Sequence, residues 1–174
     1  VCSSDLSAGA VSGVEVDSAA SLLVNGFDGI TLDTASAAAD ASFISDGGAI
    51  SIGSVTSGLD LGIAAQGVAL GLISADNIDI SSAGDISYFN ATATGNIVML
   101  AGGSLQDTGT TSGNNIDLSA AGDVFVRNIA ALGDLSVMSS GGALRIDDSM
   151  SGGSSSISAF GNIASGSNAA RFTT

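Results

Sequence analysis

Asn-Ile-Asp-Leu-Ser-Ala-Ala-Gly-Asp-Val-Phe-Val, residues 115–126, is the stretch that decides the fold of this 174-residue chain. An apolar-x-apolar run lies at each of its ends, Ile116-Asp117-Leu118 and Val124-Phe125-Val126, and a corner of small residues around Gly122 separates the two runs. Alternation of this kind places successive side chains on opposite faces of a strand, so the stretch predicts two short strands joined by a corner. Strands this short cannot bury a face alone, and they need similar neighbours to pack against.

The same pattern recurs along the chain at an interval of nineteen residues. Two apolar columns repeat at this interval: Leu59, Ile78, Ile97, Ile116 and Leu135, then Leu61, Ile80, Met99, Leu118 and Val137. Chance would put a large apolar residue at each position about a quarter of the time, so an unbroken match marks a true repeat. A further apolar column opens the second strand of each unit: Ile86, Leu105 and Val124, with Val68 and Leu144 displaced by one residue.

Two other columns define the corners. An all-glycine column precedes the second strand: Gly84, Gly103, Gly122 and Gly141. The residue before the first strand is mostly an amide: Gly58, Asn77, Asn96, Asn115 and Asp134. We expect the glycines to adopt backbone angles that a β-carbon forbids, and the asparagines to bond their stacked neighbours. Proline is absent, as expected where it would delete a ladder hydrogen bond in each coil.

These features predict an all-β fold, a right-handed parallel β-helix with about nineteen residues in each three-sided coil. The third side of each unit is the least regular, and we expect it to vary in shape and to carry any protruding loops. The most regular coils span residues 58–146. Further strands are expected at residues 14–16, 30–32, 50–52 and 157–159, and the Ala-rich segment 35–44 is interpreted as a distorted coil rather than a helix.

The sequence predicts a single β-helix domain over residues 7–174, with about nine coils. Residues 1–6 look like the translated end of a sequencing-library adapter and are interpreted as a non-native segment. That segment would include Cys2, the only cysteine, so no internal disulfide is expected.

The composition removes several kinds of chemistry. The chain has no His and only three Lys or Arg residues, all of them Arg, and its formal net charge is −14. Without His and Lys, the commonest general base and the Schiff-base and Ser-Lys mechanisms are lost. The nucleophile elbow, the phosphate loop and paired Cys motifs are also missing. The net charge opposes contact with nucleic acid or anionic lipid, and no apolar run reaches the roughly 18 residues of a membrane span.

Some residues nevertheless have a functional alternative to a structural role. Asp147 and Asp148 are adjacent carboxylates, but a glycosidase pair needs a shaped cleft that the pattern does not predict. Asn90 begins an N-glycosylation sequon. Arg127 lies nineteen residues before Ile146, so we expect it to reach Asp147 on the next coil as a surface ion pair.

Calcium is a separate alternative, because acidic β-rolls bind it. The outward column between the two apolar ones is predicted to be Asp60, Asp79, Val98, Asp117 and Ser136. Val98 and Ser136 interrupt this column, and the glycine-rich nonapeptide of β-rolls is missing. We therefore predict no catalytic, cofactor-binding or metal-binding residue and no cofactor.

The repeat resembles the filamentous haemagglutinin family, the large exoproteins of bacterial two-partner secretion. The resemblance rests on Gly-Asn-Ile-Val-Met-Leu-Ala-Gly-Gly at residues 95–103 and on residues 116–124, and it is firm from residue 59 to residue 146. It implies a non-catalytic structural and adhesive shaft segment, exported through an outer-membrane pore and secreted or held at the bacterial cell surface. The implied partners are receptors or glycans of host or neighbouring cells, reached through the parent protein. Autotransporter passenger adhesins have similar coils and stay an alternative.

Two functions of other classes are less favoured. A polysaccharide lyase or hydrolase built on a β-helix needs a carboxylate and basic cluster with long loops, which three Arg and a short coil disfavour. Ice binding needs a regular Thr ladder, which the spacing of the threonines does not provide. Neither end of the chain looks like a terminal cap, so we expect the isolated chain to associate end to end through exposed strand edges.

Overall fold

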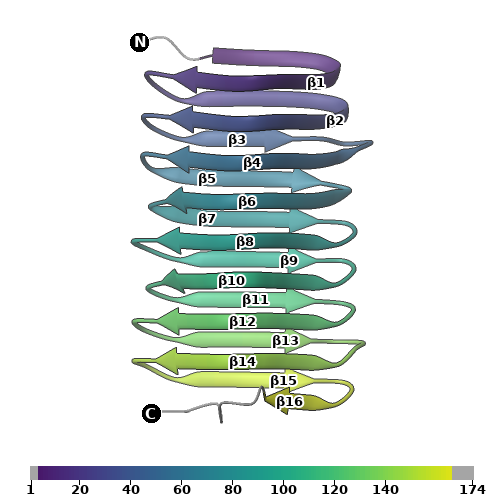
Figure 1. Ribbon diagram of the computed structural model, residues 1–174, viewed down its shortest axis with the longest axis vertical. Coiled ribbons are helices and arrows are strands. Elements are labelled where there is room, and N and C mark those ends of the chain that lie inside the picture. Colours follow the sequence, from purple (N-terminus) through teal and green to yellow (C-terminus); the bar gives the residue numbers. More distant parts are fainter. Residues whose placement is uncertain (1–3, 166–174) are drawn as a thin grey trace.

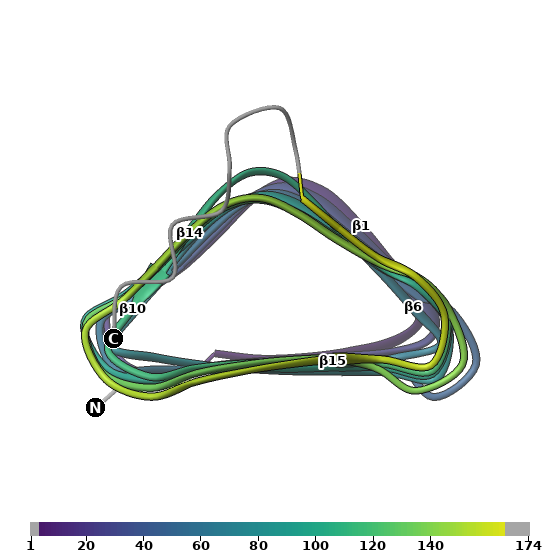
Figure 2. The same cartoon turned by 90° about the horizontal axis from the view of Figure 1, so that it is seen from below.

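A computed structural model describes residues 4–165 and confirms a parallel β-helix. Sixteen strands stack along one axis in about eight turns, roughly 19 residues apart, and residues 4–165 contain no helix (Figure 1). Seen along the axis, the coils superpose as a three-sided outline (Figure 2). The strands are β1 (Ser4–Ser18), β2 (Leu22–Ala37), β3 (Ala41–Ile44), β4 (Ala49–Ser57), β5 (Asp60–Ala65), β6 (Gly67–Ala75), β7 (Asn77–Ser82), β8 (Ile86–Ala93), β9 (Ile97–Ala101), β10 (Leu105–Gly113), β11 (Ile116–Ala120), β12 (Val124–Ala131), β13 (Leu135–Ser139), β14 (Leu144–Ser151), β15 (Ser155–Ala159) and β16 (Ile163–Ser165).

The odd-numbered strands from β3 to β15 form one side of the coil, which we call side 1. Each even-numbered strand from β4 to β14 bends once, and its two halves form sides 2 and 3. Strand β2 is long enough to follow all three sides, because it pairs with β3 through residues 22–25 and with β4 through residues 30–37. The connections within residues 4–165 contain at most the four residues of 45–48 and 140–143. The loops expected to protrude from the third side are therefore absent there.

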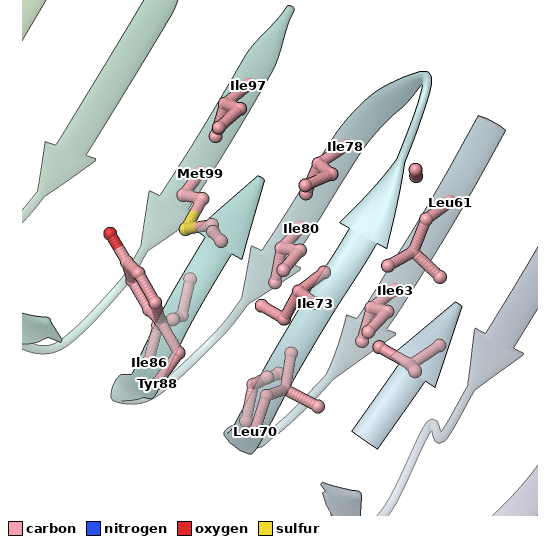
Figure 3. Close-up of a cluster of buried hydrophobic side chains, with 14 of the residues drawn as sticks. Leu61, Ile63, Leu70, Ile73, Ile78, Ile80, Ile86, Tyr88, Ile97 and Met99 are labelled. Carbon is pink, nitrogen blue, oxygen red and sulfur yellow. The ribbon is translucent and has the colours of Figure 1, made fainter. Parts of the chain in front are cut away.

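The predicted core columns are confirmed over the regular coils. Ile78, Ile97, Ile116 and Leu135 are paired in register on successive strands of side 1, and each is at most 2% exposed. Figure 3 shows the first of these, Ile78 and Ile97, side by side on neighbouring strands, with the pair Ile80 and Met99 two residues further along. The buried apolar residues form one continuous cluster along the rod. Stacking therefore provides the burial that no single coil has alone.

The predicted register is wrong at the first regular coil. Leu61, not Leu59, pairs with Ile78, so this coil has an interval of seventeen residues, and Leu59 is 48% exposed at a corner. One residue separates β5 from β6 and one separates β6 from β7, whereas three residues separate β7 from β8 and β8 from β9. This coil has fewer residues at its corners, so counting back nineteen residues from Ile78 leads to Leu59 instead of Leu61.

The expected reason for the glycine column is also wrong. Gly29 is the only described residue with a positive φ in the left-handed region, at 134°, so the corner glycines do not supply unusual angles. They supply room instead, because a β-carbon on Gly84 would lie 2.5 Å from the carbonyl oxygen of Gln66. A β-carbon on Gly122 would lie 2.8 Å from Ser104 Oγ. Val124 pairs with Leu144 twenty residues later, and in this longer coil Gly142 rather than Gly141 lies over Gly122.

The strands expected outside the regular coils are present. Residues 30–32 pair with residues 50–52, residues 14–16 lie in β1, and residues 157–159 lie in β15. The Ala-rich segment 35–44 is divided between the end of β2, a bend and β3, with no helix. Of the segment interpreted as non-native, residues 4–6 lie in β1, and residues 1–3, with Cys2, lie outside the described residues.

The alternation of buried and exposed residues on β11 generates one prediction. Ile116→Asp places an unpaired carboxylate in the apolar core, and we expect it to lower the free energy of unfolding by at least about 3 kcal/mol. Asp117→Ser changes an exposed side chain on the same strand and should stay within about 0.5 kcal/mol. Urea unfolding followed by circular dichroism measures both, and equal losses would contradict the assigned faces.

The glycine corners generate a second prediction. Gly84→Ala forces its β-carbon against the backbone of the preceding coil and should destabilise the protein by about 1–3 kcal/mol. Gly62→Ala is the matched control, since a β-carbon there has no heavy atom within 4 Å. Because alanine restricts the unfolded chain, Gly62→Ala should be neutral or stabilising by up to about 1 kcal/mol. The same urea series compares the two variants, and a stable Gly84→Ala protein would show that the coils can separate at this corner.

Candidate functional site: a groove along side 1

Two adjoining hollows on the described surface form a groove that follows side 1 along the axis of the rod. Its first part, of about 440 Å³, lies over β5, β7 and β9, and its second part, of about 510 Å³, extends to β15. Asn96 and Val98 line both parts, so the two form one continuous groove. Two rows of outward side chains bound it. We call them the corner row and the strand row.

The corner row is a chain of side-chain hydrogen bonds between successive coils. Asn77 Nδ2 donates to Asp60 Oδ1 (2.8 Å), and the amide N–H of Asn96 donates to Asn77 Oδ1 (2.9 Å). Asn115 Nδ2 donates to Asn96 Oδ1 (3.0 Å), and the amide N–H of Asp134 donates to Asn115 Oδ1 (2.9 Å). The prediction that the asparagines bond their stacked neighbours is therefore confirmed. These bonds hold the edge of the groove in place, because each amide is fixed by the coil beside it.

The strand row runs parallel to it along the middle of side 1. Strand pairing aligns its members in the order Gly62, Asp79, Val98, Asp117, Ser136 and Ser156. The predicted outward column is correct except at its first position, where the shortened coil puts Gly62 in place of Asp60. Asp79 and Asp117 thus lie two coils apart with Val98 between them. Residues 4–165 contain no group of three or more His, Cys, Asp or Glu side chains placed to hold a metal ion.

The floor of the groove is backbone rather than side chain. Ile78, Ile97, Ile116 and Leu135 line the groove, but their side chains point into the core. Val98 is 42% exposed and is the largest apolar side chain of the strand row. The groove thus combines a flat floor, one apolar contact and carboxylates on both edges.

A second polar feature lies inside the coil, where β10 departs from its neighbours. Asp107 is fully buried at an inward position that is filled by Tyr88 on β8 and by Val126 on β12. Its Oδ1 accepts the amide N–H of Gly109 (2.8 Å), and its Oδ2 accepts the hydroxyl of Thr111 (2.9 Å). The hydroxyl of Thr111 already donates its one hydrogen bond to Asp107, so the hydroxyl of Tyr88 is the donor in its bond to Thr111 Oγ1 (2.8 Å). Figure 3 shows the Tyr88 ring among the apolar side chains.

One extra residue in β10 explains this buried cluster. The register shifts between Gln106 and Thr110 relative to both β8 and β12, as in a β-bulge. The bulge leaves the N–H of Gly109 without a place in the ladder, and the Asp107 carboxylate accepts it. Burial raises the pKa of Asp107, against the opposing effects of the bonds from Gly109 and Thr111 and of the nearby Arg127. Burial, reinforced by Asp107, also raises the pKa of Tyr88. Being fully buried, Asp107 does not reach any ligand on the surface.

The cationic side chains of the described chain gather on side 2. The expected ion pair between Arg127 and Asp147 is wrong, because Arg145 takes that partner (Nε to Oδ1, 2.8 Å) and also lies 5.3 Å from the centre of the Phe125 ring. Arg127 donates instead to the carbonyl oxygen of Thr108 (3.3 Å). Both arginines therefore lie away from the groove on side 1.

The other residues singled out in the sequence occupy structural places. Asp147 and Asp148 both point outward at the bend between sides 2 and 3, and Asp147 is engaged by Arg145. The Oδ1 of Asn90, the first residue of the sequon, accepts the amide N–H of Thr110 (2.8 Å) on the next coil. Sequence reasoning missed Tyr88, Asp107 and Thr111. The signal available was the aspartate in an apolar column, at Asp107 between Tyr88 and Val126.

Comparison with known proteins adds no relative: the chain matches no family model, no curated protein and no solved structure. Within residues 4–165 there is also no helix with the length and hydropathy of a membrane span. The fold and the groove are therefore the observations on which a function has to rest.

The buried carboxyl generates a prediction about pH. Its raised pKa means that the folded state holds the Asp107 proton more tightly than the unfolded chain, whose pKa is 3.8. The stabilisation is complete below the unfolded value and is lost as the pH rises through the raised folded value. In urea unfolding at a series of pH values, Asp107→Asn should therefore gain stability relative to the wild type from about pH 4 upward, then level off. A difference between Asp107→Asn and the wild type that stays flat across the pH series would contradict the prediction.

Proposed function

We propose that this chain is a structural and adhesive shaft segment of a large secreted bacterial surface exoprotein, without catalytic activity of its own. One observation carries the proposal: coil follows coil from β1 to β16 with no connection longer than four residues. A rod of this kind extends by adding coils, and it holds whatever it carries away from the point of attachment. The resemblance of residues 95–103 and 116–124 to the filamentous haemagglutinin repeat supports the same role, as it supports export through an outer-membrane pore.

Partners would then meet the rod on its long faces. The sides present outward Ser, Thr, Asn and Asp side chains, with exposed apolar ones such as Leu72, Phe89 and Leu100 among them, and such faces suit receptors or glycans of neighbouring cells. The last described strands, β15 and β16, each pair with only one other described strand. Ile163 is 57% exposed there. Open strand edges pair with further strands, so the isolated chain associates end to end, and in a longer parent the same edges continue into further coils.

A carbohydrate-active β-helix is the second candidate, and the groove on side 1 is the observation that favours it. Asp79 and Asp117 face that groove, and extended polysaccharides bind along β-helices in such grooves when they are cleaved there. The groove lacks long loops and a basic group, since Arg127 and Arg145 lie on side 2. Without a basic group the groove cannot hold an anionic substrate, and without long loops it does not form the shaped cleft that a glycosidase carboxyl pair needs.

An assay of polysaccharide turnover separates the two candidates. The full chain is incubated with a panel of neutral and acidic polysaccharides, and new reducing ends and unsaturated products are measured. We expect no turnover, and we expect beads coated with the chain to adhere to cells or immobilised glycans more than beads coated with an acidic control protein. Turnover that is lost in the double variant Asp79→Asn, Asp117→Asn would reverse the order of the candidates. Absence of both turnover and adhesion would leave a display role without a binding role.

A further inference from the structure

The groove on side 1 has a regular spacing of charge. Asp79 and Asp117 lie on strands two coils apart, and parallel strands are about 4.8 Å apart, so their carboxylates repeat at about 9.6 Å. Val98 occupies the position between them and is 42% exposed. The corner row on the opposite edge adds Asp60 near one end and Asp134 toward the other. None of the residues that line the groove is cationic.

The surrounding charge favours a cation in this place. The chain carries a formal net charge of −14, and the two arginines within residues 4–165 both lie on side 2. A concave surface lined with one sign of charge concentrates the field and attracts the opposite sign. An anionic or neutral ligand gains nothing from this field, whereas a basic one is attracted along the whole groove.

The shape of the groove selects an extended ligand. It is long and shallow, its floor is backbone, and it follows six strands of side 1 from β5 to β15. An extended peptide in the polyproline II conformation rises about 3.1 Å per residue and repeats every three residues, about 9.3 Å. This repeat nearly equals two coils of the rod, so basic side chains three residues apart meet Asp79 and Asp117 in succession. An extended strand, with about 6.6–6.8 Å between side chains on one face, does not keep this register.

The remaining contacts suit such a peptide. Arg and Lys carry apolar stems, and a stem that crosses the groove between the two carboxylates covers Val98. Asn77 and Asn115 each use one Nδ2–H bond within the corner row. An amide nitrogen has two protons, so each has a second one for a peptide carbonyl oxygen, which a polyproline II chain leaves unpaired.

We propose that the groove on side 1 binds an extended basic peptide segment with Arg or Lys at every third residue, whose cations pair with Asp79 and Asp117. The partner is a basic, proline-rich segment of another protein in the surroundings of the rod. This inference deepens the adhesive part of the proposed function and rests on it, while the display role of the shaft does not depend on the groove.

The test uses the full chain and two labelled peptides of equal composition and charge. In one, Arg-Pro-Pro-Arg-Pro-Pro-Arg, the arginines are three residues apart, and in the other, Arg-Arg-Arg-Pro-Pro-Pro-Pro, they are adjacent. Fluorescence anisotropy at low salt measures both dissociation constants. We expect the spaced peptide to bind about fivefold more tightly, which is what one additional exposed ion pair provides at most. Equal binding of the two peptides, or no binding of either, would overturn the proposal.

Two variants then locate the binding. Asp117→Asn removes one carboxylate of the groove and should remove most of the difference between the peptides. Asp33→Asn removes the same charge from the exposed surface of side 2 and should leave the difference intact. If Asp33→Asn weakens binding as much as Asp117→Asn does, the peptide responds only to the net charge and the groove is not its site. Adhesion of coated beads is measured separately. Loss of peptide binding alone would contradict the proposal for the groove, whereas loss of bead adhesion would contradict the proposed adhesive function.

Discussion

Parallel pairing of each coil with the next is the interaction on which everything else in this molecule depends. No side of a coil has enough apolar surface to fold alone, and the ladder brings like residues to within one strand spacing of each other. The composition follows from that distance. Proline would interrupt the ladder, and a side chain at Gly84 would collide with the backbone of Gln66. Asparagine is favoured at the corner because its amide bonds the same group one coil away, as Asn115 bonds Asn96.

Much of this could be predicted from the sequence because the ladder repeats one environment many times. The columns through Ile97 and Ile116, the amide corner and the outward positions of Asp79 and Asp117 all follow from a constant interval. The constant interval fails where a coil has fewer residues at its corners, so it predicts Leu59 at the position that Leu61 occupies. A corner can be shorter without any change in the strands that flank it. The apolar pattern of the strands therefore does not reveal how many residues the corner has. The glycines were located correctly, but their role depends on the distance between coils, which a sequence does not give.

The buried cluster around Asp107 shows what a single inserted residue does in such a fold. The bulge in β10 leaves the N–H of Gly109 to be satisfied by a side chain. A carboxylate inside the coil satisfies it, and Thr111 and Tyr88 then satisfy the carboxylate. The sequence places Asp107 in the apolar column of Tyr88 and Val126, but it does not show the bulge that follows Asp107 and provides the N–H of Gly109 as its partner.

The groove on side 1 and the buried cluster around Asp107 also differ in how well they tolerate substitution. Asp107 is tied to Gly109, Thr111 and Tyr88, so a change at any of them leaves a buried polar group without a partner. Asp79 and Asp117 pack against nothing inside the coil, and replacing them alters the surface while the ladder beneath stays the same. A solenoid therefore separates the residues that hold it together from those that meet a ligand, coil by coil. In the binding mode that we propose, specificity would reside in the outward rows, where the choice of residue at each coil sets a pattern of charge at multiples of one strand spacing.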